Sequence, residues 1–459
     1  MSPPDLRAWM RVAATDDAAG LHAPAASLPW RSTIHATVLN GRREELAGKS
    51  VLIGVASQSA AALAMLELDG VVSRMVVTPP DFTPERLASA IAQAGVEAIV
   101  CDDAAKDFGV DDAPRYPVSP LMRDTIPAAA SVLTEWVLPT SGTTGAPKLV
   151  AHTLAGLLGA VRPRPADEPS PVWSTFYDIR RYGGMQIYLR AATSGATLVL
   201  TDADEPLADH VSRMASAGVT HLSGTPSHWR RLLMSPDAVR IAPRYVRLSG
   251  EIADRAILDS LAAVHPHAKI VHAYASTEAG VGFEVTDGRE GFPAAYLAGV
   301  GDVEMRIVDG SLRLRSRRTA RRYVGRDDLA LADSEGFVDT DDLVEQIGDR
   351  IFFKGRRAGT INVGGLKVHP EEVEQVINMH EAVRMSLVRA RRSPITGDLI
   401  VAQVQLKEGE PSAERKRALK DEILACCRAR LERHQTPVSI DFVPALAISP
   451  GGKLLRGRA

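Results

Sequence analysis

Short apolar runs alternate with helical patterns of apolar positions between residues 51 and 274. The run 51–56 is followed by a helical pattern over 59–68, and the run 75–78 precedes a helix that Thr83-Pro84-Glu85 opens. Such alternation predicts a parallel sheet covered by helices, so this part of the chain is expected to form a large α/β domain. Further strands are expected at 98–101, 197–200, 220–222, 245–249 and 270–274, and further helices at 208–217 and 227–234.

The pattern changes near residue 303 to short strands joined by tight turns. Strands at 303–308 and 311–315 flank Asp309-Gly310, which is typical of an antiparallel or barrel-like module. After Gly355-Arg356-Arg357 the pattern predicts a hairpin, a helix at 370–379, strands at 384–390 and 399–407, and a helix at 412–433. We therefore expect two domains: residues 1–356, with helix-covered sheets and the barrel-like module, and residues 357–459, a compact α+β unit.

The charge balance and the cysteines restrict the class of protein. The 459 residues contain 54 Lys and Arg against 56 Asp and Glu, and the formal charge of −2 provides no field that would attract nucleic acid. Three cysteines, two of them adjacent, favour a reducing cytosol over a disulfide framework. The most apolar stretch, 51–72, is interrupted by polar and acidic residues, and the amino terminus lacks the apolar region of a signal peptide. We expect a cytoplasmic protein with no membrane span and no nucleic-acid partner.

The strongest local signal is the segment Leu138-Pro-Thr-Ser-Gly-Thr-Thr-Gly-Ala-Pro-Lys148. It follows an apolar run and precedes a helical segment beginning near Thr153, so we expect it on a strand-to-helix loop. It lacks the G-x-x-x-x-G-K-[ST] order of a P-loop NTPase, and a polar surface turn is the alternative interpretation. The segment suits a polyphosphate, because it combines hydroxyl donors, glycines that let backbone amides turn inward, and the point charge of a lysine. These residues are Thr140, Ser141, Gly142, Thr143, Thr144, Gly145 and Lys148.

Six segments in order resemble the signature motifs of the adenylate-forming superfamily, which includes acyl- and aryl-CoA ligases, nonribosomal peptide synthetase adenylation domains and luciferases. The resemblance covers residues 138–453. The segments are the loop 138–148, Tyr274-Ala-Ser-Thr-Glu278, Phe337-Val-Asp-Thr-Asp-Asp342, Gly355-Arg356, the segment 364–374 that begins Gly364-Gly365, and Pro450-Gly-Gly-Lys453.

The resemblance implies an enzyme that uses ATP to activate a small carboxylic acid as an acyl-adenylate and then transfers the acyl group to the thiol of coenzyme A. Loading of the pantetheine of a carrier protein is the alternative, and a catalytically silent protein that retains the fold is a third. The first step joins two anions, so cations and hydrogen-bond donors matter more than a base.

The resemblance also assigns roles to the nucleotide-binding residues. The loop 140–148 would hold the β- and γ-phosphates, Thr277 would contact the α-phosphate, and Glu278 would help to hold Mg²⁺, which favours oxygen ligands. Asp342 would bind the ribose hydroxyls with Arg356 nearby. Tyr274 would stack on the adenine, and His272 lies where many relatives carry an amide that contacts it; for both, a place in the core is the alternative.

Lys453 matches the carboxy-terminal lysine that bridges the substrate carboxylate and the α-phosphate. It belongs to the small domain, which the resemblance implies to be mobile, with a hinge at 355–358. After rotation Gly364 and Gly365 would line the tunnel for the thiol arm. Ala358 replaces the charged hinge residue common in the family.

Four positions resemble the acyl pocket of the family. Gly250 ends a predicted strand, and Ala275 replaces the usual glycine after the tyrosine, which indicates a small or flat substrate. Tyr177-Asp178 matches a segment that faces the substrate. Asp178 would then contact an amino or hydroxylated acid, or it would pair with Arg180 or Arg181 instead.

Overall fold

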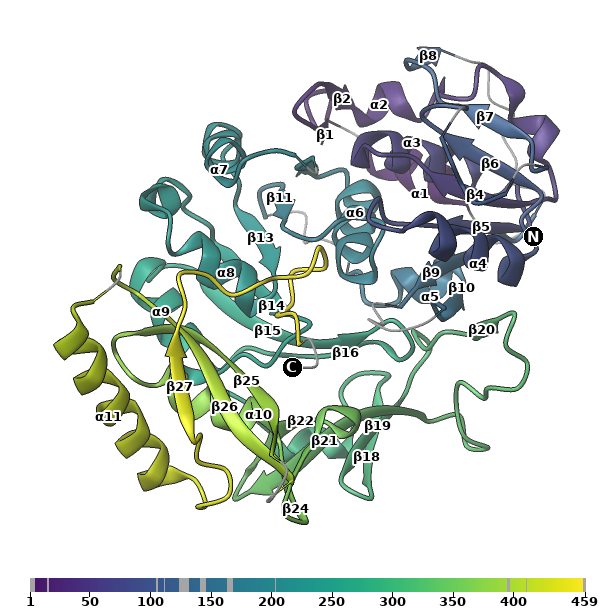
Figure 1. The fold of residues 1–459 in the computed structure, drawn as a ribbon. Coiled ribbons are helices and arrows are strands. Elements are labelled where there is room, and N and C mark those ends of the chain that lie inside the picture. The colour runs from purple at the N-terminus through teal and green to yellow at the C-terminus, as the bar shows by residue number, and fades with distance from the viewer. Residues whose placement is uncertain are drawn as a thin grey trace.

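The computed structural model describes residues 5–14, 16–104, 106–110, 112–123, 132–140, 146–162, 168–202, 204–393, 397–409 and 411–456. An eight-stranded sheet forms the centre of the large domain, as Figure 1 shows. Its strands are parallel except for the two at its ends. In spatial order they are β16 (Gly280–Val285), β15 (Lys269–Ser276), β14 (Tyr245–Ser249), β13 (His221–Gly224), β11 (Val172–Thr175), β12 (Thr197–Val199), β1 (Gly20–His22) and β2 (Ser27–Pro29).

A seven-stranded sheet lies beside the first and has a parallel centre. The run predicted at 51–56 forms an inner strand at Ser50–Gly54, which is buried throughout because neighbours cover both faces. In order the strands are β20 (Arg322–Val324), β10 (Leu149–His152), β9 (Glu135–Pro139), β5 (Arg74–Val77), β4 (Ser50–Gly54), β6 (Ala98–Cys101) and β7 (Arg115–Pro117). A separate pair joins β3 (Ala36–Thr37) to β8 (Met122–Arg123).

Helices cover these sheets where the apolar periodicity predicted them. The predicted helix after Thr83 begins there, with the Thr83 hydroxyl accepting from an amide of the first turn, and it ends at Gly95 in the left-handed conformation. The helices of the large domain are α1 (Leu6–Ala13), α2 (Trp30–Thr33), α3 (Gln58–Leu68), α4 (Pro84–Ala94), α5 (Leu154–Leu158), α6 (Tyr182–Ser194), α7 (Leu207–Ser216), α8 (Pro226–Leu232) and α9 (Arg255–Val264), with 3₁₀ turns at Arg42–Leu46, Pro236–Arg240 and Ala294–Ala298.

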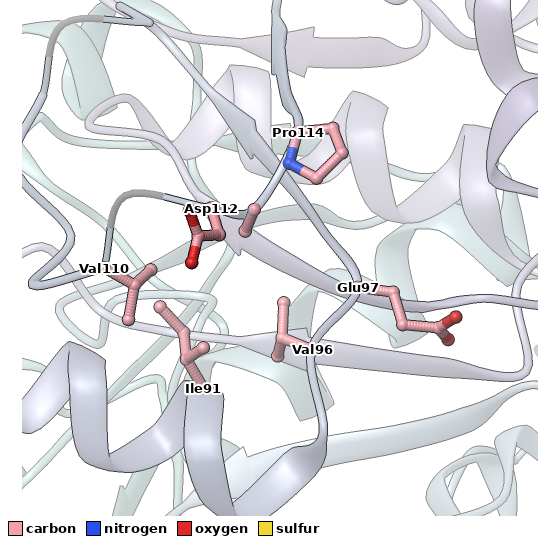
Figure 2. A pocket seen from close by; sticks show the side chains of 7 residues that line it. Ile91, Val96, Glu97, Val110, Asp112 and Pro114 are labelled. Atoms are coloured by element: carbon pink, nitrogen blue, oxygen red, sulfur yellow. The ribbon is translucent and has the colours of Figure 1, made fainter.

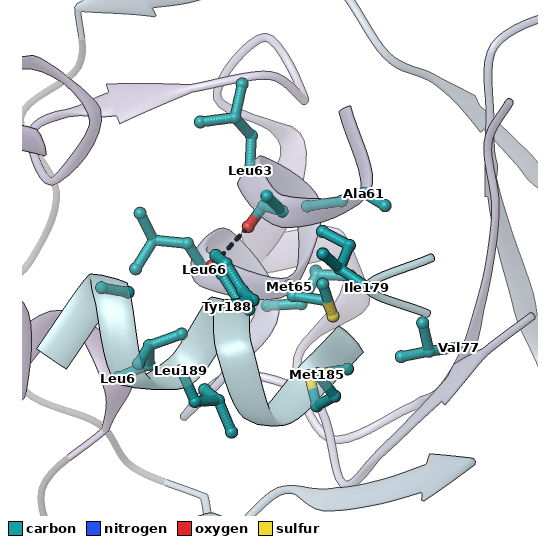
Figure 3. Close-up of a cluster of buried hydrophobic side chains, with 14 of the residues drawn as sticks. Leu6, Ala61, Leu63, Met65, Leu66, Val77, Ile179, Met185, Tyr188 and Leu189 are labelled. Atoms are coloured by element: carbon teal, nitrogen blue, oxygen red, sulfur yellow. Dashed lines mark hydrogen bonds between the residues drawn. The ribbon is translucent and has the colours of Figure 1, made fainter. Parts of the chain in front are cut away.

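The two sheets are joined through a shared core between α3 and α6 (Figure 3). Met65 and Leu66 of α3 pack with Met185 and Leu189 of α6, and all four side chains are buried. The Tyr188 hydroxyl donates a hydrogen bond of 2.9 Å to the Ala62 carbonyl oxygen, so the one polar atom of that side chain has a partner. This core fixes the positions of the two sheets relative to each other.

The expected antiparallel module is a five-stranded sheet. Asp309 and Gly310 both have positive φ, 52° and 75°, as the tight turn of a two-residue hairpin requires. Its strands are, in order, β17 (Phe292–Pro293), β22 (Arg350–Arg356), β21 (Val338–Ile347), β19 (Ser311–Arg315) and β18 (Glu304–Val308).

The small domain is the predicted α+β unit. A 3₁₀ turn at Arg357–Gly359 leads into it, and helices α10 (Pro370–Asn378) and α11 (Ala413–Arg430) share its apolar core with the sheet. The sheet consists of β24 (Leu366–Val368), β23 (Ile361–Val363), β26 (Gly397–Leu406) and β25 (Val383–Ser393), with β27 (Ser439–Phe442) paired to β26. The final described segment, 443–456, is called the tail below.

The sequence predicted that the loop after β9 leads directly into a helix, and this part of the prediction is wrong. The chain returns along β9 as the antiparallel strand β10 before α5 begins, so the loop joins two strands. The four residues of β10 are all buried, and such a short apolar run has no periodicity that separates a strand from a helix start. Its second neighbour, β20, comes from a distant part of the sequence.

Within the described residues, no helix combines the length and the apolar character needed to cross a membrane.

We expect Met65→Ala to lower the free energy of unfolding by about 2–5 kcal/mol, since it opens a cavity between α3 and α6. Met65 is completely buried, whereas Val12 is 82% exposed, so Val12→Ala is a control expected to change the value by less than about 0.5 kcal/mol. Urea denaturation measures both values. Equal effects of the two substitutions would contradict the position of this core.

Candidate active site

The loop that was expected to bind phosphate starts and ends on neighbouring strands. The Thr140 amide donates a 2.9 Å hydrogen bond to the Lys148 carbonyl oxygen, which closes the base of the loop. The Lys148 side chain is exposed, and its ammonium lies 5.5 Å from the centre of the Tyr323 ring. The predicted residues Ser141, Gly142, Thr143, Thr144 and Gly145 lie outside the described residues.

Tyr274, Asp342 and Arg356 form one hydrogen-bonded group. The Tyr274 hydroxyl donates to Asp342 Oδ2 at 2.5 Å, and Arg356 Nε lies 3.3 Å from Asp342 Oδ1. Asp342 and Arg356 face each other because β21 and β22 place them in register. Each carboxylate oxygen of Asp342 has further lone-pair capacity, which suits the binding of hydroxyls.

The Tyr274 ring lies in a stack of aromatic side chains. The Phe353 ring is nearly parallel to it at 5.3 Å and 6°, and the Phe283 ring at 5.6 Å and 18°. Burial, and then the carboxylate of Asp342, raise the pKa of Tyr274 well above its usual value. The phenol therefore stays neutral and acts as a donor to Asp342.

His272 lies on β15, two residues before Tyr274, and the backbone of Arg289 holds its ring. Its Nε2 lies 2.8 Å from the Arg289 carbonyl oxygen, which only accepts hydrogen bonds, so Nε2 carries the proton. Burial lowers the pKa of His272 below its usual value. The neutral ring therefore has Nδ1 as an acceptor.

Thr277 and Glu278 lie in the turn that follows β15. The Glu278 carbonyl oxygen accepts from the Ala320 amide at 2.9 Å, which fixes the turn. Burial, and then the Glu278 carboxylate, raise the pKa of Tyr323. The same carboxylate also acts electrostatically on Arg356 and Lys453.

Lys453 reaches this site from the small domain. A Cβ atom at Gly250 would lie 3.4 Å from Lys453 Cε, so the lysine stem passes directly over the end of β14. Burial lowers the pKa of the Lys453 ammonium, and the Arg356 guanidinium lowers it further, while Glu251, Asp342 and Glu278 act in the opposite direction. The structure therefore brings the predicted lysine together with the predicted ribose and metal residues.

The tail that carries Lys453 is anchored in its own domain by an ion pair. Both nitrogens at the end of Arg456 lie 2.7 Å from the Glu374 carboxylate, one on each oxygen. Glu374 also accepts from the Val388 amide at 2.8 Å. Burial raises the pKa of Glu374 to about 7. The bidentate geometry with Arg456 favours the ionised carboxylate and fixes the tail on α10.

Gly364 and Gly365 lie away from this site, at the tip of the hairpin between β23 and β24. Both have positive φ, 59° and 93°, and the Asn362 side chain accepts from the Gly365 amide at 2.9 Å. A Cβ atom at either position would have nothing within 4 Å. In this conformation the hairpin tip is exposed and is not part of the site around Lys453.

The residues expected in the acyl pocket divide into two groups. The Tyr177 hydroxyl donates to the Ser249 carbonyl oxygen at 2.5 Å and lies 3.7 Å from a Cβ built at Gly250, so Tyr177 and Gly250 border Lys453. Burial raises the pKa of Tyr177. Ala275 lies at the irregularity of register in β15, directly after Tyr274.

Asp178 forms an ion pair with Arg180. Arg180 Nε and Nη2 donate to its two carboxylate oxygens at 2.8 and 2.6 Å. Arg180 is buried and also donates to the Val55 and Ala56 carbonyl oxygens. The observed pair with Arg180 is the alternative that the sequence analysis left open for Asp178.

Three residues that the sequence analysis did not select surround the tail next to Lys453. Thr225 and Glu251 hydrogen bond to the backbone of the tail, and the His228 ring lies against Gly452. The one local signal was Thr225-Pro226, a helix start in which proline occupies the first turn. That signal predicts the cap of α8 but contains no information about a partner more than 200 positions later.

The described residues contain no group of three or more His, Cys, Asp or Glu side chains arranged to hold a metal ion. Mg²⁺ in nucleotide-dependent enzymes needs only one or two carboxylates, since phosphate and water supply its other ligands. Glu278, which is partly buried and has two cations within electrostatic range, fits that use.

A pocket of about 520 Å³ lies elsewhere, at the end of α4 (Figure 2). It shares no residue with the site around Lys453. Glu97, one of its two acidic residues, accepts from the Ser50 amide at 2.9 Å and so supports the sheet. The lining residues are Ile91, Val96, Glu97, Val110, Asp112, Ala113 and Pro114.

Comparison with known proteins identifies the family of this chain. The family model for AMP-binding enzymes matches residues 54–319, more than half of the chain, and the model for the AMP-binding enzyme C-terminal domain matches residues 372–453. The chain belongs to this family of adenylate-forming enzymes. The two matched regions contain Thr277, Glu278 and Lys453, which the structure brings together.

Curated relatives include enzymes of several types. The chain is 28% identical over 345 residues to the p-hydroxybenzoic acid–AMP ligase FadD22 of Mycobacterium tuberculosis, covering 69% of this chain and 47% of that protein. It is 28% identical over 334 residues to the 2-succinylbenzoate–CoA ligase of Salmonella typhimurium, covering 69% and 66%. It is 26% identical over 413 residues to a component of the linear gramicidin synthase of Brevibacillus parabrevis, covering 82% of this chain and 5% of that protein. The chain thus spans less than two thirds of the length of each.

Solved structures share the fold over nearly the whole chain. A benzoate CoA ligase from Burkholderia xenovorans aligns with a TM-score of 0.82 at 18% identity, covering 98% of this chain and 99% of that one. The anthranilate CoA ligase AuaEII, solved with anthranoyl-AMP, aligns with a TM-score of 0.81 at 17% identity, covering 98% and 95%. These similarities establish the two-domain fold of adenylate-forming enzymes.

We expect Tyr274→Phe to weaken the binding of a nonhydrolysable ATP analogue about 5-fold, the equivalent of one neutral hydrogen bond, because it removes the donor that orients Asp342. Tyr296→Phe is the matched control: its hydroxyl donates to the Glu284 carbonyl oxygen at 3.1 Å, in the same aromatic cluster, without contacting Asp342. Isothermal titration calorimetry measures both affinities. An unchanged Kd for Tyr274→Phe would contradict the role given to this bond.

Proposed function

We propose that this protein is an AMP-forming acid–thiol ligase. It uses ATP as a substrate to activate a carboxylic acid as an acyl-adenylate and then transfers the acyl group to the thiol of coenzyme A. The observation that carries this proposal is the burial of the Lys453 ammonium over Gly250, within electrostatic range of Glu278, Asp342 and Arg356. A partly buried cation is suited to the joining of two anions, because it reduces the repulsion between them.

The charges of the site fit an attack by a carboxylate on a phosphate. The ammonium of Lys453 would contact both the carboxylate and the α-phosphate, which reduces their repulsion and holds them in line. Thr277 would donate to the α-phosphate, and Lys148 would contact the outer phosphates. Mg²⁺ bound by Glu278 would supply further positive charge to the phosphates. Asp342 and Arg356 would fix the ribose.

The small domain would take part in both half-reactions, with Lys453 in the first and with Gly364 and Gly365 in the second. Gly364 and Gly365 are exposed here, so delivery of a thiol past them requires the small domain to turn about residues 355–358. Gly355 has φ of 134°, and a Cβ atom there would lie 2.4 Å from Glu371 Oε2, so this end of the hinge accepts only glycine. The present conformation, with Lys453 in the site, is the one that adenylation needs.

An aromatic carboxylic acid is the substrate class that we propose. p-Hydroxybenzoic acid, 2-succinylbenzoate, benzoate and anthranilate occur in the names of the relatives and solved structures above. Ala275 adds a methyl group at the expected pocket wall, which fits a flat ring. A pyrophosphate-exchange screen over aryl, short acyl and amino acids tests the class, and exchange with amino acids alone would contradict it.

Loading of a carrier protein is the second candidate for the thiol step. The match to the linear gramicidin synthase covers more of this chain than the matches to the ligases, and this favours a carrier protein as the acceptor. Both acceptors present the same thiol arm. An assay that compares coenzyme A with a phosphopantetheinylated carrier protein separates the two.

We expect Lys453→Ala to slow adenylation at least about 100-fold, the loss typical for removal of one transition-state donor. Transfer from a supplied acyl-adenylate to the thiol should stay near the wild-type rate, because Lys453 is then away from the reacting atoms. Pyrophosphate exchange measures the first step, and product formation from the supplied adenylate measures the second.

The matched control for Lys453→Ala is Lys420→Ala. Lys420 lies in the same domain but on the exposed side of α11, where its ammonium is 4.0 Å from Asp441. Both half-reactions should be unchanged in this variant. Equal losses in the two half-reactions of Lys453→Ala would contradict the role proposed for the lysine.

A further inference from the structure

The two residues next to Lys453 in the chain are held by side chains of the large domain. In Figure 1 the tail (yellow) leaves β27 and extends beside α8 and β14 of the large domain. We propose that Thr225 and Glu251 are positioning residues that bind the tail backbone at Gly452 and Leu454 and thereby select the conformation for adenylation. This inference rests on the function proposed above.

Thr225 contributes a buried hydroxyl that binds in two directions. Its Oγ1 accepts from the His228 amide at 3.0 Å as the cap of α8, and it donates to the Gly452 carbonyl oxygen at 2.5 Å. The side chain is completely buried. Because the helix cap fixes the position of Thr225 Oγ1, the hydroxyl is already placed to donate to the tail when the domains close.

Glu251 holds the other side of Lys453. Its Oε1 accepts from the Leu454 amide at 3.0 Å and from the Ser227 hydroxyl at 3.0 Å, and its Oε2 accepts from the Ser227 amide at 2.9 Å. Two of these three donors belong to the large domain. The carboxylate is therefore oriented by its own domain and offers one remaining position to the tail.

His228 forms the wall against which Gly452 rests. A Cβ atom at Gly452 would lie 1.8 Å from His228 Cε1, and the glycine has φ of 75°. The ring cannot move aside easily, since Phe176 and Tyr177 pack on it at 5.6 Å and the Thr225 amide donates to its Nδ1 at 3.2 Å. Only glycine fits between this wall and the Thr225 hydroxyl.

Rotation of the small domain would break some contacts of the tail and leave others intact. The bonds from Thr225 and Glu251 cross between the domains, as does the 3.1 Å bond from Asn378 to Asp254. They must break when the domain turns. The pair of Arg456 with Glu374 lies within the small domain and persists. Thr225 and Glu251 thus favour one conformation and not the other.

The test uses Thr225→Val, which keeps the shape of the side chain and removes the donor. Thr225→Ser restores the hydroxyl. Thr83→Val is the matched control: Thr83 also caps a helix with proline in the first turn, and it has no contact with the tail. It reports the effect of a lost cap alone. Gly452→Ala is a second variant that prevents docking from the side of the tail.

Amide hydrogen exchange of the tail in the full-length protein without nucleotide gives a readout other than activity. We expect exchange of the segment 446–456 to be about 5-fold faster in Thr225→Val and in Gly452→Ala, and to stay at the wild-type rate in Thr225→Ser and Thr83→Val. Unchanged exchange in both Thr225→Val and Gly452→Ala would overturn the inference.

The half-reactions give the second readout. In Thr225→Val we expect the kcat of pyrophosphate exchange to fall about 5-fold at an unchanged KM for ATP, with transfer from a supplied acyl-adenylate as fast as in the wild type or faster. Equal loss in both half-reactions, or the same loss in Thr83→Val, would overturn the inference. Absence of any exchange in the wild-type protein refutes the proposed function instead, and the hydrogen-exchange result still decides whether Thr225 holds the tail.

Discussion

The structure depends on the placement of one partly buried ammonium group, that of Lys453, at a boundary between two domains. A charge leaves water at a large cost unless fixed partners replace the solvent. Lys453 lies among Glu251, Glu278 and Asp342, with the Arg356 guanidinium opposing them. The large domain is therefore built to receive a cation that belongs to another part of the chain. That arrangement makes the site complete only when the domains are closed.

Each part of the fold contributes to this arrangement. The parallel strands β13, β14 and β15 end at one edge, and Thr225, Gly250, Glu251, Thr277 and Glu278 all follow these ends, where α/β sheets commonly bind ligands. The antiparallel module supplies Asp342 and Arg356 from two paired strands. The shared core of α3 and α6 joins the two sheets of the large domain into one unit.

The sequence predicted the elements whose signals are local, and missed those that need a distant partner. The helix after Thr83 and the turn at Asp309-Gly310 have their signals within a few residues, and both were confirmed. The strand β10 needs β20 from residues 322–324, and its own four residues do not show this. Motifs located Lys453 and Asp342. They could not locate Thr225 and Glu251, because these residues bind a tail that lies about 200 residues later in the sequence. For Asp178 the sequence left two roles open, and the structure shows the pair with Arg180.

The most direct test is a crystal structure of the full-length protein with a nonhydrolysable mimic of an aryl-adenylate. The account predicts the Lys453 ammonium within hydrogen-bond distance of the group that replaces the phosphate, with the ribose on Asp342 and the aryl ring beside Tyr177 and Gly250. A mimic bound at any other place, or bound here with Lys453 directed to solvent and the tail released, would contradict it.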